Sequence, residues 1–196
     1  TVTEFLHRRH GIERQRRQVL VGPGSKELIF LTQLAYAGEL LVPSPSWVSY
    51  APQARIIGRR VNWLPTDFAH DWKLLPETLD AHCRATPGLP RLLILNYPGN
   101  PTGVSYREDE LAELAGVARR HQVLVVSDEI YADLDHSGRT ASISHHYPEG
   151  TIVSTGLSKW CGAGGWRLGL FSVPEELEWL CAAITVIGTE TFTSVS

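Results

Sequence analysis

Lys159 and Arg167 lie eight residues apart in one glycine-rich segment of this 196-residue chain. Lys159 follows the apolar run 151–155, and a lysine at the end of a strand can be partly desolvated. Desolvation favours the neutral amine, which can attack a carbonyl group and form an imine. The intervening glycines let the backbone approach a planar ligand closely. The segment therefore predicts a nucleophilic lysine, although either residue taken alone is more often a surface side chain or an ion-pair partner.

A second glycine-containing turn, at residues 22–24, precedes a predicted helix that starts at Ser25. Free backbone amides and the helix dipole meet at such a start, and both attract an anion. The turn therefore suits a phosphate group. The alternative is a simple turn with an N-cap, because the segment matches neither the P-loop nor the dinucleotide-binding glycine pattern.

Two proline-containing turns follow other predicted strands. In the first, the prolines stiffen the loop before Trp47, whose ring could stack on a flat ligand; the alternative is that Trp47 and Tyr50 cap the core. The second turn, at residues 96–103, is predicted to be rigid and is a candidate for a cis peptide between Asn100 and Pro101. The side chain of Asn100 either faces a ligand or bonds its own backbone.

Two adjacent acids, Asp128 and Glu129, follow the apolar run 123–126. Acids in this position are poorly placed for solubility alone, so we expect at least one to have a partner. Asp128 could hold a cation such as a protonated ring nitrogen, and Tyr131 would present a phenol beside it. The alternative is that Asp128 caps a helix.

Apolar runs alternate with amphipathic segments along the chain, which favours strands joined by crossover helices. We predict strands at 39–42, 91–95, 122–127, 151–155 and 168–173, a weaker strand at 59–64, and helices at 25–36, 76–84, 106–121 and 174–187. Ser105 and Glu108 form a candidate capping box for the third helix. Continuous apolar strands are typical of a parallel sheet covered on both faces. We therefore predict an α/β fold with three αβα layers and a mostly parallel sheet, in a single domain over 1–196.

The chemical groups of these turns complement one another. Together they offer an anion site after the short apolar run 19–21, and a stacking ring, hydrogen-bond donors, a carboxylate and an amine, each after a predicted strand. A phosphorylated, planar, cationic aldehyde would need all five. This convergence favours a ligand site over the separate structural explanations.

Three motifs resemble those of the class I/II aminotransferases, which are fold-type I pyridoxal-phosphate enzymes. The lysine segment fits the family signature as Gly156-Leu-Ser-Lys159-x-x-Gly-Ala-x-Gly-x-Arg167-Leu-Gly169, and Asn-Pro-Thr-Gly at 100–103 and Asp-Glu-Ile-Tyr at 128–131 have the family's order and spacing. The resemblance covers nearly the whole chain. It implies the large-domain fold of these enzymes, in truncated form, with pyridoxal 5'-phosphate as cofactor.

The resemblance also implies a role for each residue. Lys159 would bind the cofactor as a Schiff base, Asp128 would bond the pyridine nitrogen, and both would be catalytic together with Tyr131. Asn100 and Tyr131 would contact the phenolic oxygen, and Trp47 would stack on the ring. The phosphate would be held by Ser25, Lys26, Arg167 and the amide of Gly24 or its neighbours. Gly156 departs from the family, which often has a serine or threonine there that assists the phosphate.

The activity implied is the transfer of an amino group from an amino acid to a 2-oxo acid, in a homodimer. Two alternatives remain open. One is another enzyme on the same scaffold, such as a carbon-sulfur lyase or an aminocyclopropane-carboxylate synthase. The other is a non-catalytic cofactor-binding domain of a regulator. Family members have a further N-terminal segment and a C-terminal small domain, so we expect residues 1–196 to be most of the large domain of a longer protein.

The composition is that of an ordinary globular chain, with 43% hydrophobic and 20% charged residues. A formal net charge of -3 gives no electrostatic reason to expect nucleic acid, and no apolar run is long enough to span a bilayer. The basic stretch 8–17 is interrupted by Glu13, and we interpret it as a solvated helix face. Three cysteines without paired spacing favour free thiols and a cytoplasmic location, and the eight histidines show no metal-binding spacing.

Overall fold

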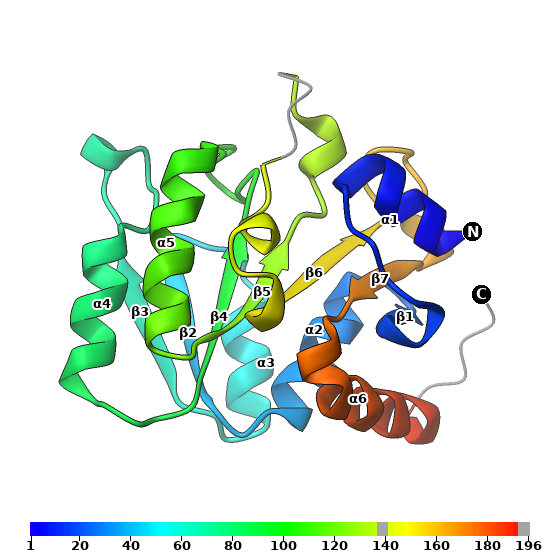
Figure 1. The fold of residues 1–196 in the computed structure, drawn as a ribbon, viewed down its shortest axis with the longest axis horizontal. Helices are drawn as coiled ribbons and strands as arrows, with labels where there is room; N and C mark the ends of the chain where they lie inside the picture. The colour runs from blue at the N-terminus through cyan, green and yellow to red at the C-terminus, as the bar shows by residue number, and fades with distance from the viewer. Residues whose placement is uncertain (137–140, 192–196) are drawn as a thin grey trace.

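The computed structural model describes residues 1–136 and 141–191, which fold around one sheet of seven strands (Figure 1). The order across the sheet is β1-β7-β6-β5-β4-β2-β3. The strands are β1 (Val19–Gly22), β2 (Glu39–Ser44), β3 (Val61–Pro65), β4 (Arg91–Asn96), β5 (Leu124–Asp128), β6 (Thr151–Gly156) and β7 (Gly169–Ser172). Strands β3, β2, β4, β5 and β6 are parallel neighbours, whereas β7 runs antiparallel to both β6 and β1. The predicted mostly parallel sheet is confirmed.

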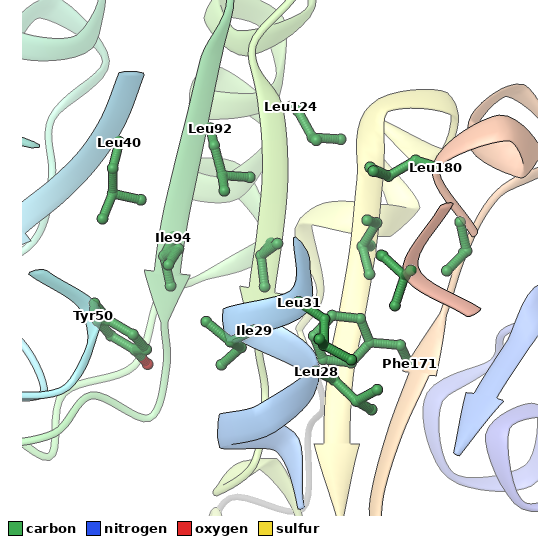
Figure 2. Packing of buried hydrophobic residues seen from close by; sticks show 14 of the residues in the cluster. Leu28, Ile29, Leu31, Leu40, Tyr50, Leu92, Ile94, Leu124, Phe171 and Leu180 are labelled. Carbon is green, nitrogen blue, oxygen red and sulfur yellow. The ribbon is translucent and has the colours of Figure 1, made fainter. Parts of the chain in front are cut away.

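Helices cover both faces of this sheet (Figure 1). They are α1 (Val2–His10), α2 (Ser25–Ala35), α3 (Tyr50–Ile56), α4 (Pro76–Ala85), α5 (Glu108–Arg120) and α6 (Glu178–Thr191). Alternate residues of each central strand point to opposite faces, so Leu40 packs with α2, α3 and α6 while Leu41 packs with α4 and α5. Figure 2 shows the first of these two cores, in which Tyr50 of α3 lies beside Ile94 of β4. The three-layer αβα fold follows from strands that bury both faces.

Several predicted boundaries of helices and strands are wrong by a few residues, and the predicted N-cap of one helix is the wrong residue. Helix α5 begins at Glu108 with Arg107 as its N-cap, and the backbone N–H of Arg107 donates to Glu110 at 2.8 Å. Ser105 therefore does not cap this helix. Tyr106 lies outside the helix because the backbone of Arg107 is extended, and the Tyr106 hydroxyl accepts the backbone N–H of Leu74 at 2.8 Å.

Two helices differ from the sequence-based expectation. Helix α3 was not predicted, because its sequence contains a proline in the first turn and is only seven residues long. The basic stretch 8–17 is helical only as far as His10, because Gly11 adopts a left-handed conformation with φ of 64° and ends α1. None of the helices in residues 1–136 and 141–191 has the length and apolar character needed to cross a bilayer.

Candidate active site

A cavity of about 190 Å³ lies where the parallel strands end, at their carboxyl edge. Its walls come from the turns after β2, β4, β5 and β6 and from the start of α2. The lining residues are Ser25, Lys26, Trp47, Tyr50, Asn96, Asn100, Asp128, Ile130, Tyr131, Ser158, Lys159 and Arg167. Every predicted site residue except Gly24 is among them. A larger surface groove of about 800 Å³, near Glu13 and Glu175, contains none of them, so we place the candidate site in the smaller cavity.

Asp128 forms the buried end of the cavity. It is the last residue of β5, with 3% of its surface exposed, and Tyr50 donates a hydrogen bond of 2.6 Å to its Oδ2. Ser154 Oγ lies 3.4 Å from Oδ1. Burial raises the pKa of Asp128 to about 6, and the hydrogen bond from Tyr50 opposes this shift. Asp128 is therefore a strand residue and not the helix cap that we considered as an alternative.

No lysine, arginine or histidine within residues 1–136 and 141–191 forms an ion pair with Asp128. A buried carboxylate without a cationic partner is costly unless a ligand supplies the positive charge. This carboxylate lines the cavity, so it fits a cationic ring nitrogen.

Asn100, Tyr131 and Lys159 lie together at the middle of the cavity. The Asn100 side chain donates to the Tyr131 hydroxyl at 3.4 Å, and its backbone N–H is held by Asn96 Oδ1 at 2.8 Å. The cis peptide predicted between Asn100 and Pro101 is present. Lys159 Nζ lies 5.3 Å from the centre of the Tyr131 ring. The turn therefore presents the Asn100 side chain to the cavity and does not use it for a local backbone turn.

Lys159 itself is exposed to solvent, so the expectation that its strand desolvates it is wrong. The reason is its position: β6 ends at Gly156, and Lys159 stands three residues further along, in the turn above the sheet. The lysine therefore faces the cavity from its open side. Its proximity to Tyr131 and Asn100, and not burial in the sheet, is what distinguishes it from other surface lysines.

The start of α2 and Arg167 form the other end of the cavity. Gly24 is the N-cap of α2, with φ of 100° and no side-chain cap, so the first amides of the helix are free to bind an anion. Arg167 Nη1 donates to the carbonyl of Gly164 at 2.8 Å and Nη2 to that of Pro23 at 3.2 Å. A Cβ on Gly24 would lie 2.1 Å from Arg167 Nη2. The absence of a side chain on Gly24 thus lets the guanidinium reach the helix start, which is the cradle that a phosphate needs.

Trp47 and Lys26 complete the wall between these ends. The two rings of Trp47 and Tyr50 meet edge to face with centroids 5.3 Å apart, and Lys26 Nζ lies 5.8 Å from the Trp47 ring. Trp47 is half-buried and packs against the core, so it both caps the core and lines the cavity. Sequence reasoning placed Tyr50 only in the core and missed its bond to Asp128. It also missed Asn96, whose Nδ2 donates to the carbonyl of Asp128 at 2.8 Å.

The sequence profile described as aminotransferase class I and II matches residues 1–194. The chain belongs to this aminotransferase family. The aspartate aminotransferase of Bacillus subtilis (strain 168) is 32% identical over 184 residues, which are 90% of this chain and 46% of that protein. A bifunctional aspartate and glutamate/aspartate-prephenate aminotransferase of Petunia hybrida is 33% identical over 202 residues, covering 100% of this chain and 42% of that protein.

Solved aminotransferase structures have the same fold. The aspartate aminotransferase of Rhizobium meliloti superposes with a TM-score of 0.91 at 25% identity, over 100% of this chain and 49% of that one. The Thermus thermophilus aspartate aminotransferase with maleate gives a TM-score of 0.89 at 31% identity, over 98% of this chain and 50% of that one. The chain thus spans about half the length of these aminotransferases. The family generally uses pyridoxal phosphate, which agrees with the donor set of the cavity.

Proposed function

We propose that this chain is the cofactor-binding part of a pyridoxal-phosphate-dependent aminotransferase that moves an amino group from an amino acid to a 2-oxo acid. The observation that carries the proposal is the buried carboxylate of Asp128, which has no cationic partner among the described residues and lies in the same cavity as the amine of Lys159. The free backbone amides at the start of α2, beside Arg167, supply an anion site for the cofactor's phosphate. Family membership supports the same activity.

We infer that the cofactor's phosphate binds at the first amides of α2, those of Ser25 and Lys26, with the side chains of Arg167 and Lys26 as cationic partners. The N–H of Gly24 itself donates to the carbonyl of Gly22 at 2.7 Å. Gly156 provides no hydroxyl for this phosphate, so the backbone amides carry more of its binding. At the opposite end, Asp128 would hold the pyridine nitrogen. Trp47 would stack on the ring, and Asn100 and Tyr131 would donate hydrogen bonds to its phenolic oxygen.

The residues around the ring would divide the work of proton transfer and charge stabilisation. When bound, pyridoxal phosphate supplies an electron sink for the bond broken at the α-carbon of the substrate. Lys159 Nζ is the group that would attach the cofactor and move a proton to and from that carbon. Asp128 would stay ionised, because a bound cation lowers the pKa that burial raises. The Tyr50 hydroxyl keeps the Asp128 carboxylate oriented throughout.

The chain would act as one domain of a larger assembly. We infer that residues 1–196 form the pyridoxal-phosphate-binding large domain, and that the protein acts as a cytoplasmic homodimer on amino acid and 2-oxo acid substrates. Relatives at similar identity are named for aspartate, asparagine and aromatic amino acids.

The first experiment replaces the lysine. With pyridoxal phosphate added, wild-type protein should show the visible absorbance of lysine-bound cofactor, and Lys159→Ala should not. Lys73→Arg is a matched control, since Lys73 pairs with Glu110 at 2.9 Å outside the cavity. Borohydride reduction followed by peptide mass spectrometry should place the cofactor's mass on Lys159. A visible spectrum that is the same in Lys159→Ala and wild type would overturn the assignment.

A product assay separates the aminotransferase from the other enzymes of this scaffold. An aminotransferase conserves the amino group in a second amino acid, so the amount of new amino acid should equal the 2-oxo acid consumed. A lyase would instead release ammonia and pyruvate. Release of one equivalent of ammonia per turnover would replace the proposed activity with lyase activity while leaving the cofactor site in place.

A further inference from the structure

Helix α1 contacts both of the turns that carry the proposed catalytic groups, although none of its residues lines the cavity. Its buried Leu6 packs against Val153 of β6, which places the helix beside the edge of the sheet formed by β6, β7 and β1 (Figure 1). The contacts made by Phe5 and His10 are more specific than this packing. They reach the residue that follows Lys159 and the residue that follows Asp128.

The first contact joins α1 to the lysine turn. The ring of Phe5 stacks on Trp160 with centroids 6.1 Å apart and an interplanar angle of 14°. Trp160 is the immediate neighbour of Lys159, and the turn from Leu157 onward has few strand hydrogen bonds because β6 ends at Gly156. A stacked aromatic pair favours one arrangement of the two rings. The Phe5 ring therefore restricts the path of the chain at Lys159.

The second contact joins α1 to the carboxylate turn. His10 Nδ1 lies 3.5 Å from Glu129 Oε2, and both side chains are fully buried. The other oxygen, Oε1, accepts hydrogen bonds from Ser127 at 2.8 Å and Ser142 at 2.6 Å. Apart from this contact, His10 Nδ1 and Glu129 Oε2 have no hydrogen-bond partner within the described part of the chain. These two buried polar atoms therefore have each other as partners. Glu129 directly follows Asp128 in the chain, so the contact reaches the carboxylate turn.

The two contacts are themselves connected. Phe5 and His10 meet edge to face with ring centroids 5.8 Å apart. A continuous chain of side chains therefore runs from Trp160 through Phe5 and His10 to Glu129. It links the turn of Lys159 to the turn of Asp128 through side chains of α1, by a route that is separate from the strand pairing.

We infer that Phe5 and His10 are positioning residues, and that α1 fixes the lysine turn and the carboxylate turn relative to each other before the cofactor binds. This inference rests on the proposed function for the roles of Lys159 and Asp128. Helix α1 would thus affect cofactor binding although none of its residues lines the cavity. The coupling acts through packing and a buried pair, so it should be present in the cofactor-free protein.

The test compares Phe5→Leu, which removes the ring but keeps an apolar side chain, with Leu79→Val, which removes one buried methylene group from α4, outside the cluster that holds α1. In cofactor-free protein, Phe5→Leu should speed hydrogen–deuterium exchange in peptide 157–163 by about three- to tenfold, the range expected from the loss of one aromatic pair. His10→Gln should do the same in peptide 129–132. Phe5→Tyr keeps the ring and should exchange like wild type, and Leu79→Val should leave both peptides unchanged.

In protein loaded with pyridoxal phosphate, Phe5→Leu and His10→Gln should speed cofactor dissociation by a similar factor and alter the visible circular dichroism of the cofactor, while Leu79→Val should do neither. Wild-type rates of exchange and of cofactor dissociation in both Phe5→Leu and His10→Gln would overturn the inference, and so would equal changes in Leu79→Val. If wild-type protein fails to bind pyridoxal phosphate, the proposed function fails, but exchange in the cofactor-free protein still decides whether α1 orders the two turns.

Discussion

The carboxylate end of the cavity is buried and bonded on several sides, whereas the arginine end is open to solvent. Asp128 lies in a strand, accepts a hydrogen bond from Tyr50, and its backbone carbonyl is bonded by Asn96. Arg167 is exposed, follows the short 3-10 turn Gly164–Trp166 and is held by two backbone carbonyls. One end is therefore part of the folded core, and the other is a cation placed beside a helix start.

Mutations at the two ends of the cavity should therefore have different consequences. A change at Asp128 or Tyr50 alters the free energy of unfolding, because these groups are desolvated by folding itself. A change at Arg167 leaves the core intact and alters only the binding of an anion. Measuring both stability and cofactor affinity for each variant should therefore show whether the substituted residue belongs to the buried end or to the open end of the cavity.

The largest effect is expected at Asp128. Its folded pKa of about 6 lies above its ordinary value, so between about pH 4 and pH 6 the folded state binds more protons than the unfolded state. The contribution of this group to stability is then present at low pH and lost as pH rises through about 6, by up to about 3 kcal/mol. Asp128→Asn should abolish this slope, as measured by urea unfolding of the cofactor-free protein between pH 4.5 and 7.5.

Other carboxylates titrate in the same range, so the informative quantity is the difference between wild type and variant at each pH. Asp71→Asn provides the control. Asp71 is exposed and already has φ of 53°, a conformation that asparagine also tolerates. Equal pH slopes in wild type and Asp128→Asn would show that the carboxylate is hydrated, and the contrast between the two ends would disappear.

A smaller effect is expected from Tyr50→Phe. The variant keeps the packing of the ring beside Ile94 but removes the donor to Asp128 Oδ2, leaving a buried carboxylate oxygen without its strongest partner. Loss of a hydrogen bond to a charged group costs about 1.5–3 kcal/mol. The cost should be largest above pH 7, where Asp128 is ionised, and smaller near pH 5.

Tyr131→Phe is the matched control, because its hydroxyl makes only a 3.4 Å contact with Asn100 and the residue is half-buried. Thermal and urea unfolding should show a clearly smaller loss of stability for Tyr131→Phe than for Tyr50→Phe. If the two variants lose the same stability, the bond from Tyr50 does not support the buried end as the geometry indicates.

The sequence predicted the sheet and most of the cavity because those features are encoded locally. Continuous apolar runs identified strands such as β4 and β5, and short motifs identified Asn100, Asp128 and Lys159 at strand ends. In a parallel sheet such ends share one edge, so the motifs could be brought together without coordinates.

The missed features depend on contacts between distant parts of the chain. Tyr50 reaches Asp128 across 78 positions, and no local pattern distinguishes that tyrosine from one that only fills the core. The pairing of His10 with Glu129 depends on how α1 packs against β6, which periodicity does not encode. The exposure of Lys159 depends on where β6 ends, and strand ends are set by neighbouring strands as much as by sequence.

The smallest effect is expected from Arg167→Lys, and it tests the open end of the cavity. Lysine keeps the charge but cannot donate to Gly164 and Pro23 through a planar fork, so pyridoxal phosphate should bind about three- to tenfold more weakly, or about 1 kcal/mol. Unfolding should be unchanged within about 0.5 kcal/mol, as for exposed positions in general. The control is Arg107→Lys, at an exposed arginine outside the cavity. A loss of stability in Arg167→Lys as large as that of Tyr50→Phe would mean that the arginine belongs to the core after all, and the two ends would not differ in kind.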